Sequence, residues 1–511
     1  MRVLLYYPNL YGMNMLPPAI GIFTSILKRE GHEVQLFDTT IYEKVMKDDG
    51  MDFDKVKADN LNARPFDDTL LKESIRQSDA VEDFIHLVKV FKPDLIAMSI
   101  TEDMYLRGVT LLGALGMLKP KVVAGGVFPT FAPELTLELS EGAIDYVIIG
   151  EGEEALPELC RRLDENQDIH DVPGFYMIDQ GKMIKNPLPR PVDVDSIPLA
   201  DFSLFAESRY YRPMQGKLRR MLPIETMRGC PYRCAYCNSP SQMDIFKDND
   251  MKFFRKKSLE LVKKEILYAR DVYKADSLYF WADTFLAWNK KEFDEFCEIY
   301  KDFKLPFWMQ TRPETITEYK MKKLKEIGLL RISFGLEHGD ETFRAKILDR
   351  KIKNEVILRN LDIVADHDIP FSVNNILGFP GETRELAFKT IELNRHIRSD
   401  GINAYTFIPF HGTPLRKVTE DLNLIDSKTL TQSIGTPTVI NMKQFPPEEI
   451  EGIRRCFVLY VKLPKSMWPQ IEKAEKSSPE GDKIFEELKL ICSKNYMSYS
   501  QPQENQVDDG L

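Results

Sequence analysis

The sequence predicts an α/β protein, in which a doubly wound, Rossmann-like parallel sheet precedes a partial (β/α)6 TIM barrel and a helical C-terminal region. Two series of short apolar segments alternate with helical patterns, the first in residues 1–165 and the second from residue 222. Strands that alternate with helices form parallel sheets, which supports this fold class. A run of cysteines follows the first strand of the second series and carries most of the functional argument.

Length and composition limit the possible functions. The chain has 511 residues, more than one hydrophobic core usually covers, so we expect two large domains with appended segments. Its formal net charge of −10 argues against a sequence-independent nucleic-acid binder, which needs a basic stripe. We interpret the short basic run 255–257 as the solvated start of a helix.

Cysteine usage and hydropathy indicate a cytoplasmic protein. Four cysteines stand singly on helical patterns, as core-filling reduced thiols do: Cys160, Cys297, Cys456 and Cys492. The N-terminus reads as a strand ended by Pro8 and not as a signal peptide. No apolar run approaches the ~20 residues that span a bilayer, so we expect no membrane span.

The first series predicts the doubly wound sheet in residues 1–165. We expect its strands at Val3–Tyr7, Val34–Asp38, Leu95–Ile100, Val122–Gly126 and Tyr146–Ile149. We expect helices at Ala19–Arg29, Tyr105–Leu118 and Pro133–Leu139. The charged stretch 41–79 breaks the pattern and is interpreted as a partly helical insertion.

Small and polar residues stand at the carboxyl ends of three of these strands, where doubly wound sheets bind ligands. They are Ser99, Thr101, Gly125, Gly126, Val127, Phe128, Pro129, Thr130, Gly150, Glu151, Gly152 and Glu153. Glycines let a backbone approach a large ligand closely, but ordinary α/β domains also end strands with glycine, so both explanations stay open. No G-x-G-x-x-G follows the first strand, which counts against a dinucleotide.

A hairpin and a proline-rich linker are predicted for residues 166–221. The hairpin is expected over 174–185, with its turn at Gln180-Gly181. Four prolines between 187 and 198 then indicate an extended chain between domains.

The second series predicts an open, partial barrel over residues 222–416, with its chemistry at the carboxyl ends of the strands. Strands are expected near Pro223–Thr226, Ser277–Ala282, Phe307–Gln310, Ile332–Gly335, Ser372–Leu377 and Ala404–Ile408. The clearest helices are Leu259–Val272, Lys291–Phe303 and Asn354–Ala365. Residues 417–497 are predicted helical, with a helix start at Pro446-Pro447, and the polar tail 498–511 is predicted disordered.

The cysteine run Cys230, Cys234 and Cys237, spaced C-x3-C-x2-C, lies in a loop after the first barrel strand. Three thiolates can hold three irons of a cubane cluster and leave the fourth iron open. A zinc knuckle or a chance group of buried thiols is the alternative. Zinc would need a nearby fourth ligand, and no Cys or His lies between Asn238 and Lys290.

This run, with Tyr236 directly before its last cysteine, resembles the signature of the radical S-adenosylmethionine (SAM) superfamily. The resemblance implies a 4Fe-4S cluster whose open iron is chelated by SAM. It further implies that the strand ends of the barrel contact SAM through Tyr236, Asp283, Arg312, Ser333, Glu337, Leu377 and Gly378. Each of these residues could instead be a helix cap or part of an ion pair at the barrel rim.

The three loops at residues 99–101, 125–130 and 150–153, together with residues 16–21, resemble the cobalamin-binding domain found ahead of some radical SAM domains. The chain departs from many cobalamin proteins in one respect, because no D-x-H-x-x-G motif follows its first strand. His32 and His86 lie in this region outside any such motif, and we interpret them as surface or helix-end residues.

The two resemblances imply a cobalamin-dependent (class B) radical SAM methyltransferase acting on an unactivated carbon of a small molecule. Such enzymes use a 5′-deoxyadenosyl radical and methylcobalamin, with a flavodoxin- or ferredoxin-like electron donor. A cyclase or ring-rearranging enzyme with the same cofactors and no net methyl transfer is the alternative. A cobalamin or iron–sulfur sensor is the non-enzyme alternative, although sensing requires no SAM-binding loops.

Overall fold

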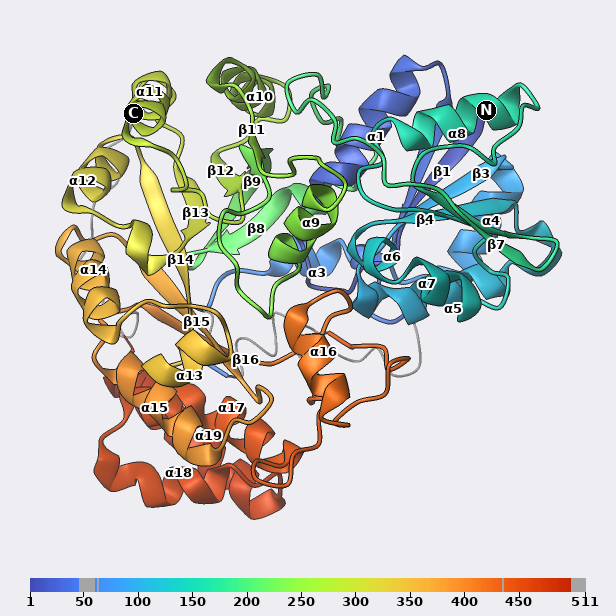
Figure 1. The fold of residues 1–511 in the computed structure, drawn as a ribbon. Helices are drawn as coiled ribbons and strands as arrows, with labels where there is room; N and C mark the ends of the chain where they lie inside the picture. Colours follow the sequence, from blue (N-terminus) through green and yellow to red (C-terminus); the bar gives the residue numbers. More distant parts are fainter. Residues whose placement is uncertain (46–59, 62–63, 434–435, 498–511) are drawn as a thin grey trace. The chain divides into compact units, whose positions relative to one another are not determined.

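The computed structural model describes residues 1–45, 60–61, 64–433 and 436–497 (Figure 1). The chain divides into two compact units, each treated by itself below. The first contains Met1–Phe53, Asp67–Gln310 and Pro409–Ser433, and the second contains Asp54–Phe66, Thr311–Ile408 and Ile434–Leu511. The predicted disordered tail and most of the middle of the predicted 41–79 insertion lie outside the described residues.

The first unit contains the predicted doubly wound sheet. Its strands are β1 (Arg2–Tyr7), β2 (Glu33–Asp38), β3 (Leu95–Ser99), β4 (Lys121–Gly125), β5 (Tyr146–Ile148), β6 (Phe175–Asp179) and β7 (Lys182–Lys185). The spatial order is β2-β1-β3-β4-β5-β6-β7, parallel as far as β5, and the hairpin β6–β7 pairs antiparallel. The five predicted strands and the hairpin are therefore confirmed.

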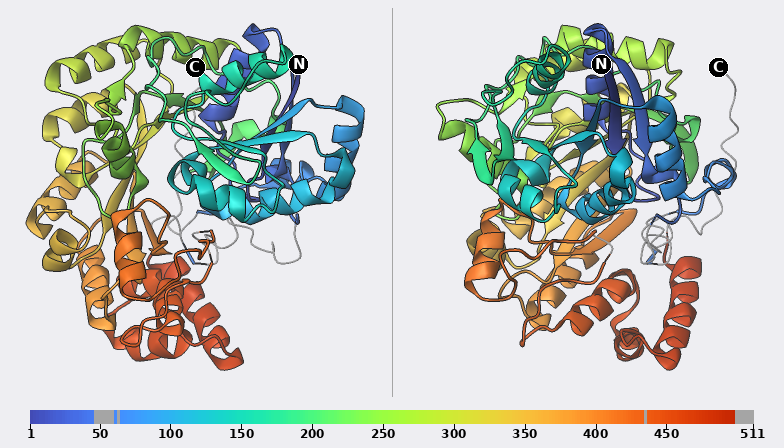
Figure 2. Two further views of the ribbon diagram at one scale, coloured as in Figure 1. Left: turned by 45° about the vertical axis from the view of Figure 1, so that its right-hand side comes forward. Right: turned by 90° about the vertical axis from the view of Figure 1, so that its right-hand side faces the viewer.

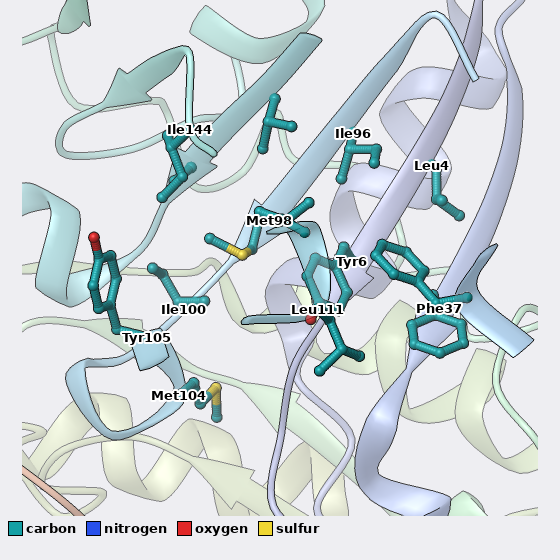
Figure 3. Close-up of a cluster of buried hydrophobic side chains, with 14 of the residues drawn as sticks. Leu4, Tyr6, Phe37, Ile96, Met98, Ile100, Met104, Tyr105, Leu111 and Ile144 are labelled. Atoms are coloured by element: carbon teal, nitrogen blue, oxygen red, sulfur yellow. The ribbon is translucent and has the colours of Figure 1, made fainter. Parts of the chain in front are cut away.

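Helices cover this sheet and explain why its strands read as continuous apolar runs. They are α1 (Pro18–Arg29), α3 (Thr69–Glu73), α4 (Ala80–Phe91), α5 (Tyr105–Ala114), α6 (Val127–Phe131), α7 (Pro133–Glu138) and α8 (Ala155–Asp164). The inward side chains of α4, α5, α6 and α7 join those of the strands in one core around Tyr6, Phe37 and Met98 (Figure 3). Phe84 of α4 stacks on Tyr6 with ring centroids 4.9 Å apart.

Two local predictions in this region were wrong. The helix expected over 105–118 ends at Ala114 and continues as a 3₁₀ turn over 116–118, because Gly116 adopts a φ of 52°. The loop expected after β4 contains the short helix α6, which begins at Val127. Helices α4 and α8 are further elements that the sequence reasoning did not identify.

The proline-rich linker packs against helix α1. Ile22 and Ile26 of α1 form a small core with Val192, Val194 and Ile197. The amide of Asp201 donates to the carbonyl of Gly21 at 2.9 Å. The linker is therefore fixed by apolar burial and backbone bonding, although it forms no regular strand or helix over the four prolines.

The first unit also contains the first half of the strand–helix series. Its elements are the strands β8 (Tyr211–Met214), β9 (Lys217–Glu225), β10 (Met227–Arg228), β11 (Arg255–Lys256), β12 (Ser277–Trp281) and β13 (Phe307–Thr311), with helices α9 (Asn238–Lys247), α10 (Leu259–Asp271), α11 (Lys290–Tyr300) and α16 (Pro414–Asp421). Strands β9, β12 and β13 are parallel, and β8 pairs antiparallel with β9.

The basic run 255–257 is not the solvated helix start that we expected. Arg255 and Lys256 form β11, which pairs with β10. Lys257 is buried and lies 2.6 Å from Glu265 and 3.4 Å from Glu225. Lys257 is buried and not solvated because the carboxylates of Glu225 and Glu265 take the place of water around its charge.

The second unit contains the second half of the strand–helix series and the C-terminal helices. Its strands β14 (Leu329–Glu337), β15 (Phe371–Leu377) and β16 (Gly401–Thr406) are parallel. Its helices are α12 (Glu318–Glu326), α13 (Glu341–Lys346), α14 (Asn354–Asp366), α15 (Arg384–Arg395), α17 (Pro447–Lys462), α18 (Trp468–Ala474) and α19 (Pro479–Asn495). The last three helices pack on one another (Figure 2).

The six parallel strands of the predicted partial barrel are all present, which confirms the predicted fold class. The helix expected to start at Pro446-Pro447 begins at Pro447. None of the helices in the described part of the chain is both long enough and apolar enough to cross a membrane.

Candidate functional site

The cysteine loop follows β10 and leads directly into helix α9. Cys230 and Cys234 are buried and Cys237 is half-buried at the start of α9. Cys230 Sγ lies 3.3 Å from the Thr284 hydroxyl, which comes just after β12. The three thiols are thus presented where β9, β10 and β12 end, as the barrel prediction required.

Burial raises the pKa of the Cys230 and Cys237 thiols, that of Cys237 to about 12. Asp283 and Cys234 add to the rise at both positions, so the three sulfur atoms lie within electrostatic reach of one another. A bound cation would remove this penalty, since a coordinating thiol is deprotonated outright. Among the described residues, no group of three or more His, Cys, Asp and Glu side chains could hold a metal ion.

Asp283 stands two residues beyond β12, near the thiols, and is exposed. The hydroxyl of Ser239, on α9, donates to its Oδ2 at 2.5 Å. Desolvation by the surrounding protein raises the pKa of this carboxyl, the Ser239 hydrogen bond opposes the rise, and the nearby Glu225 adds to it. A carboxyl with a raised pKa next to a cluster of thiols is typical of a functional site.

The predicted cobalamin-binding loops meet at one edge of the doubly wound sheet. Strands β3, β4 and β5 are parallel neighbours, so their carboxyl ends lie side by side. The Ile100 amide donates to the Gly125 carbonyl at 3.0 Å, and the Gly150 amide donates to Thr130 Oγ1 at 3.0 Å. Gly126 has a φ of 120°, and a Cβ there would lie 2.3 Å from the Ile100 carbonyl oxygen. These contacts fix the three loops to one another.

The carboxylates of Glu151 and Glu153 point to the cysteine loop. Arg228, two residues before Cys230, lies 3.0 Å from Glu151 and 2.6 Å from Glu153 through its Nη1 and Nη2 atoms. Its Nε donates to Glu225 at 3.0 Å. Arg255 Nη1 donates to Glu151 Oε2 at 3.1 Å. Buried ion pairs therefore join the loop after β5 to the strand that carries the cysteines.

A later segment of the first unit contacts both loops. Glu102, just after β3, accepts hydrogen bonds from the amides of His411 and Thr431 at 3.0 and 2.8 Å. The His411 carbonyl accepts from Asn238 at 2.8 Å, and the Leu415 amide donates to the Ala235 carbonyl at 3.0 Å. Residues 409–431 therefore contact the region of the cobalamin loops and the cysteine loop at the same time.

The other predicted SAM contacts lie in the second unit. Glu337 ends β14 with a φ of 69° at a shift in the β14–β15 register. Its carboxylate pairs with Arg350 at 3.0 Å, and the Ser333 hydroxyl lies 3.1 Å from that of Ser372. Left-handed backbone at a non-glycine residue is strained, and such strain gathers at functional sites.

Leu377 and Gly378 close β15 next to a buried acid. Glu382 accepts hydrogen bonds from the amides of Gly378 and Phe379 at 2.6 and 3.0 Å. Its other oxygen lies 3.3 Å from His338 Nε2, and both side chains are fully buried. His338 therefore has a structural partner in Glu382. Arg312, after β13, donates from Nε to Glu314 at 2.6 Å.

The structure thus brings together the cysteines, Asp283 and the three predicted cobalamin-binding loops in the first unit. Tyr236 also belongs to this unit, whereas Arg312, Ser333, Glu337, Leu377 and Gly378 belong to the second. Sequence reasoning missed Arg228, Arg255 and Glu102. Only the position of Arg228 beside the cysteines could have pointed to it, because its partners Glu151 and Glu153 lie more than 70 residues earlier.

Two family models match the chain. A B12 binding domain matches residues 58–160, and the Radical SAM superfamily matches residues 224–393. The first covers the predicted cobalamin-binding loops, and the second covers the three cysteines and all the predicted SAM contacts. The B12 binding domain lies N-terminal to the radical SAM domain, in agreement with both resemblances.

Similar proteins agree with this arrangement. "Uncharacterized methyltransferase PH0819" of Pyrococcus horikoshii is 25% identical over 407 residues, which cover 78% of this chain and 85% of that protein. The radical SAM methyltransferase TsrM of Kitasatospora setae, solved with cobalamin and a [4Fe-4S] cluster, has a TM-score of 0.60 at 16% identity, over 96% of this chain and 99% of that one.

The cobalamin-dependent radical SAM enzyme OxsB, solved with aqua-cobalamin and SAM, has a TM-score of 0.64 at 16% identity, over 96% of this chain and 71% of that one. At such identities both structures establish the fold, while the family models cover the two sites. The chain therefore contains a B12 binding domain followed by a radical SAM domain.

Proposed function

We propose that this protein is a methyltransferase that methylates an unactivated carbon of a small molecule, with a 4Fe-4S cluster, SAM and cobalamin as its cofactors. The observation that carries the proposal is the ion-pair link from Arg228 to Glu151 and Glu153. It connects the loop that would hold the cluster with a loop that would hold the corrin. Methyl transfer from a corrin requires the two cofactors to share one reaction space.

The donor sets fit these cofactors. Cys230, Cys234 and Cys237 offer three soft ligands on one loop, which matches a cubane with one open iron. The edge formed by the loops after β3, β4 and β5 offers backbone groups and hydroxyls at the ligand-binding end of a doubly wound sheet. When bound, the cluster supplies an electron for SAM cleavage and the corrin carries the methyl group.

The protein's own residues would bind and orient the cofactors and exclude water from the site. Asp283 is fixed by Ser239 and stands beside the cysteines, so it is suited to receive the amino group of SAM. The raised pKa of its carboxyl favours the protonated form until a cation arrives, because desolvation disfavours an unpaired charge. Ser333, Glu337, Leu377 and Gly378 would contact the rest of SAM, and Arg312 would add a positive charge.

The remaining partners follow from this chemistry. The cluster needs a one-electron donor of the flavodoxin or ferredoxin type. The structure joins none of the seven cysteines in a disulfide, which supports a reducing compartment such as the cytoplasm. The acidic balance of charge supports a small-molecule substrate and not a nucleic acid.

The direct test uses SAM with a trideuterated methyl group. Reconstituted, reduced enzyme is incubated anaerobically with a small-molecule extract of the source cells, and the mixture is searched by mass spectrometry for a product carrying the label. We expect a labelled product together with 5′-deoxyadenosine and S-adenosylhomocysteine. Formation of 5′-deoxyadenosine without S-adenosylhomocysteine or label would overturn methyl transfer and favour the cyclase alternative. Absence of any SAM cleavage would overturn the enzymatic proposal itself.

A further inference from the structure

Three aromatic side chains form a continuous wall on one face of β12 and β13. Phe280 of β12 packs against Phe296 of α11, so it faces the helices. Side chains alternate along a strand, so its neighbours Tyr279 and Trp281 lie on the opposite face. Trp308 of β13 stacks on Tyr279 and therefore shares that face. We call Tyr279, Trp281 and Trp308 the aromatic wall.

The wall is rigid at its base. The rings of Tyr279 and Trp308 are stacked, with centroids 4.1 Å apart and planes at 23°. Trp281 meets Tyr279 edge to face, with centroids 5.7 Å apart and planes at 72°. Both geometries are favoured by aromatic quadrupoles, so each ring holds its neighbour in place.

The outermost member of the wall is open to solvent. Tyr279 and Trp308 are 4% and 8% exposed, whereas Trp281, at the carboxyl end of β12, is 37% exposed. A tryptophan that served the core alone would be covered like its two neighbours. Its exposure at the ligand-binding end of a barrel strand instead fits a surface that a ring can cover.

A positive charge lies on the same wall. The guanidinium carbon of Arg212, on β8, lies 4.7 Å from the centroid of the Trp308 ring. A guanidinium stacked on an aromatic face is held in orientation by that ring. The wall therefore combines flat apolar surface with a fixed cation.

The wall adjoins the cysteine site. Trp281 stands two residues before Asp283, whose Oδ2 accepts a hydrogen bond at 2.5 Å from Ser239, the second residue after Cys237. The next residue, Thr284, places its hydroxyl 3.3 Å from Cys230 Sγ. The carboxyl end of β12 therefore joins the aromatic wall to the cysteine loop.

We propose that Tyr279, Trp281, Trp308 and Arg212 form the substrate subsite, and that the substrate is an aromatic ring system bearing an anionic group such as a carboxylate. Trp281 would stack on the ring and Arg212 would bind the anion. This inference rests on the proposed function and names the substrate class that the same site would take.

The test measures binding of simple probes to enzyme loaded with cluster, cobalamin and SAM, by isothermal titration calorimetry. Indole-3-propionate carries both features, 3-cyclohexylpropionate lacks the aromatic ring, and 3-(indol-3-yl)propan-1-ol lacks the charge. We expect indole-3-propionate to bind tightest. Trp281→Leu should weaken it about tenfold, while Trp281→Phe, which keeps a ring, should restore most of the loss. Arg212→Gln should weaken the carboxylate probe about tenfold and leave the alcohol unchanged.

Trp288→Phe is the matched control, because Trp288 is buried between Phe285 and Phe296 on the helix-facing side. It should leave probe binding unchanged. The proposed subsite would be overturned if all probes bound equally or if none bound to the wild type. It would also be overturned if Trp281→Leu lowered the melting temperature without weakening probe binding. SAM cleavage by the same wild-type preparation tests the proposed function separately, since cleavage without probe binding rejects only the subsite.

Discussion

Arg228 Nη2 lies 2.6 Å from Glu153 Oε1, although 75 residues separate the two along the chain. Both side chains are almost fully removed from solvent, and Glu151 and Glu225 bind the same guanidinium. The pKa of Arg228 is raised well above its usual value because the coulombic pull of Glu225, Glu153 and Glu151 exceeds the opposing effect of burial. This residue therefore keeps its charge and holds three carboxylates that would otherwise repel one another.

The first prediction concerns this residue. Arg228→Met leaves three buried carboxylates without their shared cation, so it should lower the free energy of unfolding by about 3–5 kcal/mol. Urea unfolding of the purified variant measures the loss. Arg233→Met is the control, because Arg233 pairs with Asp244 on the exposed side of the cysteine loop and should cost at most about 1 kcal/mol. Equal losses in the two variants would contradict the role of Arg228.

The second prediction concerns the cluster. Replacing any one of Cys230, Cys234 and Cys237 by Ala should abolish the brown absorbance of reconstituted protein and SAM cleavage together, because two thiolates cannot retain the cubane. Cys297→Ala is the control, since this thiol lies buried on α11. The assignment fails if Cys297→Ala bleaches the protein while Cys234→Ala does not.

The third prediction concerns Glu337. The strained backbone and the Arg350 pair hold its carboxylate at the end of β14. If the carboxylate accepts a SAM hydroxyl, Glu337→Gln should weaken SAM binding by about 1–3 kcal/mol, the range for a hydrogen bond to a charged group. Equilibrium dialysis with labelled SAM measures this, and cluster content should not change.

Glu355→Gln, an exposed position on α14, is the control for that experiment. Unchanged SAM affinity in Glu337→Gln would make the residue a rim ion pair with Arg350 and nothing more.

The fourth prediction is that cobalamin binds without a histidine ligand from the protein and with its benzimidazole tail displaced. His32 precedes β2 at the edge of the sheet opposite the predicted cobalamin-binding loops, and its Nδ1 lies 3.3 Å from the N-terminal amine. His86 is exposed on α4. His411 lies near the loops, but its ring nitrogens lie 2.9 Å from Glu102 and 3.3 Å from the Ser427 carbonyl.

Electron paramagnetic resonance of bound cob(II)alamin tests this. The spectrum should lack nitrogen superhyperfine splitting in the wild type. A splitting that disappears in His32→Ala, His86→Ala or His411→Ala would disprove the prediction and identify the ligand.

The fifth prediction concerns pH. Burial raises the pKa of Glu265 to about 7 from an ordinary value of 4.5; the ion pair with Lys257 opposes this rise, and the nearby Glu225 carboxylate adds to it. Between those two values the folded protein binds a proton that the unfolded chain has released. The contribution of Glu265 to the free energy of unfolding should therefore fall by about 3 kcal/mol as the pH rises from 4.5 to 7. Above pH 7 this contribution should stay constant.

Glu265→Gln should remove this slope in unfolding experiments across that pH range. Glu260→Gln, an exposed position on the same helix, should keep it. An unchanged slope in Glu265→Gln would mean that the carboxyl stays ionised in its pair with Lys257.

The sequence by itself determined the fold class and the order of the two domains. Short apolar strands and amphipathic helices are local patterns, and burial on both faces of a sheet leaves few other ways to arrange them. The cluster site could also be predicted from the sequence, because cluster binding depends on the spacing of cysteines within one loop. The cobalamin-binding loops could be predicted because parallel strands bring their carboxyl ends to one edge.

The tertiary structure decided which charges meet. Glu151 and Glu153 read as ligand contacts, and Arg255 and Lys257 as a solvated run, yet all four form ion pairs, Lys257 buried and the other three half-buried. The partners of Glu151, Glu153 and Arg255 lie more than 70 residues away along the chain, so no local pattern records their pairing. The same holds for the aromatic wall: alternation placed Tyr279 and Trp281 on one face, but only the pairing of β12 with β13 set Trp308 against them. Long-range electrostatics and packing depend on the positions of whole strands, and those positions exist only in the folded chain.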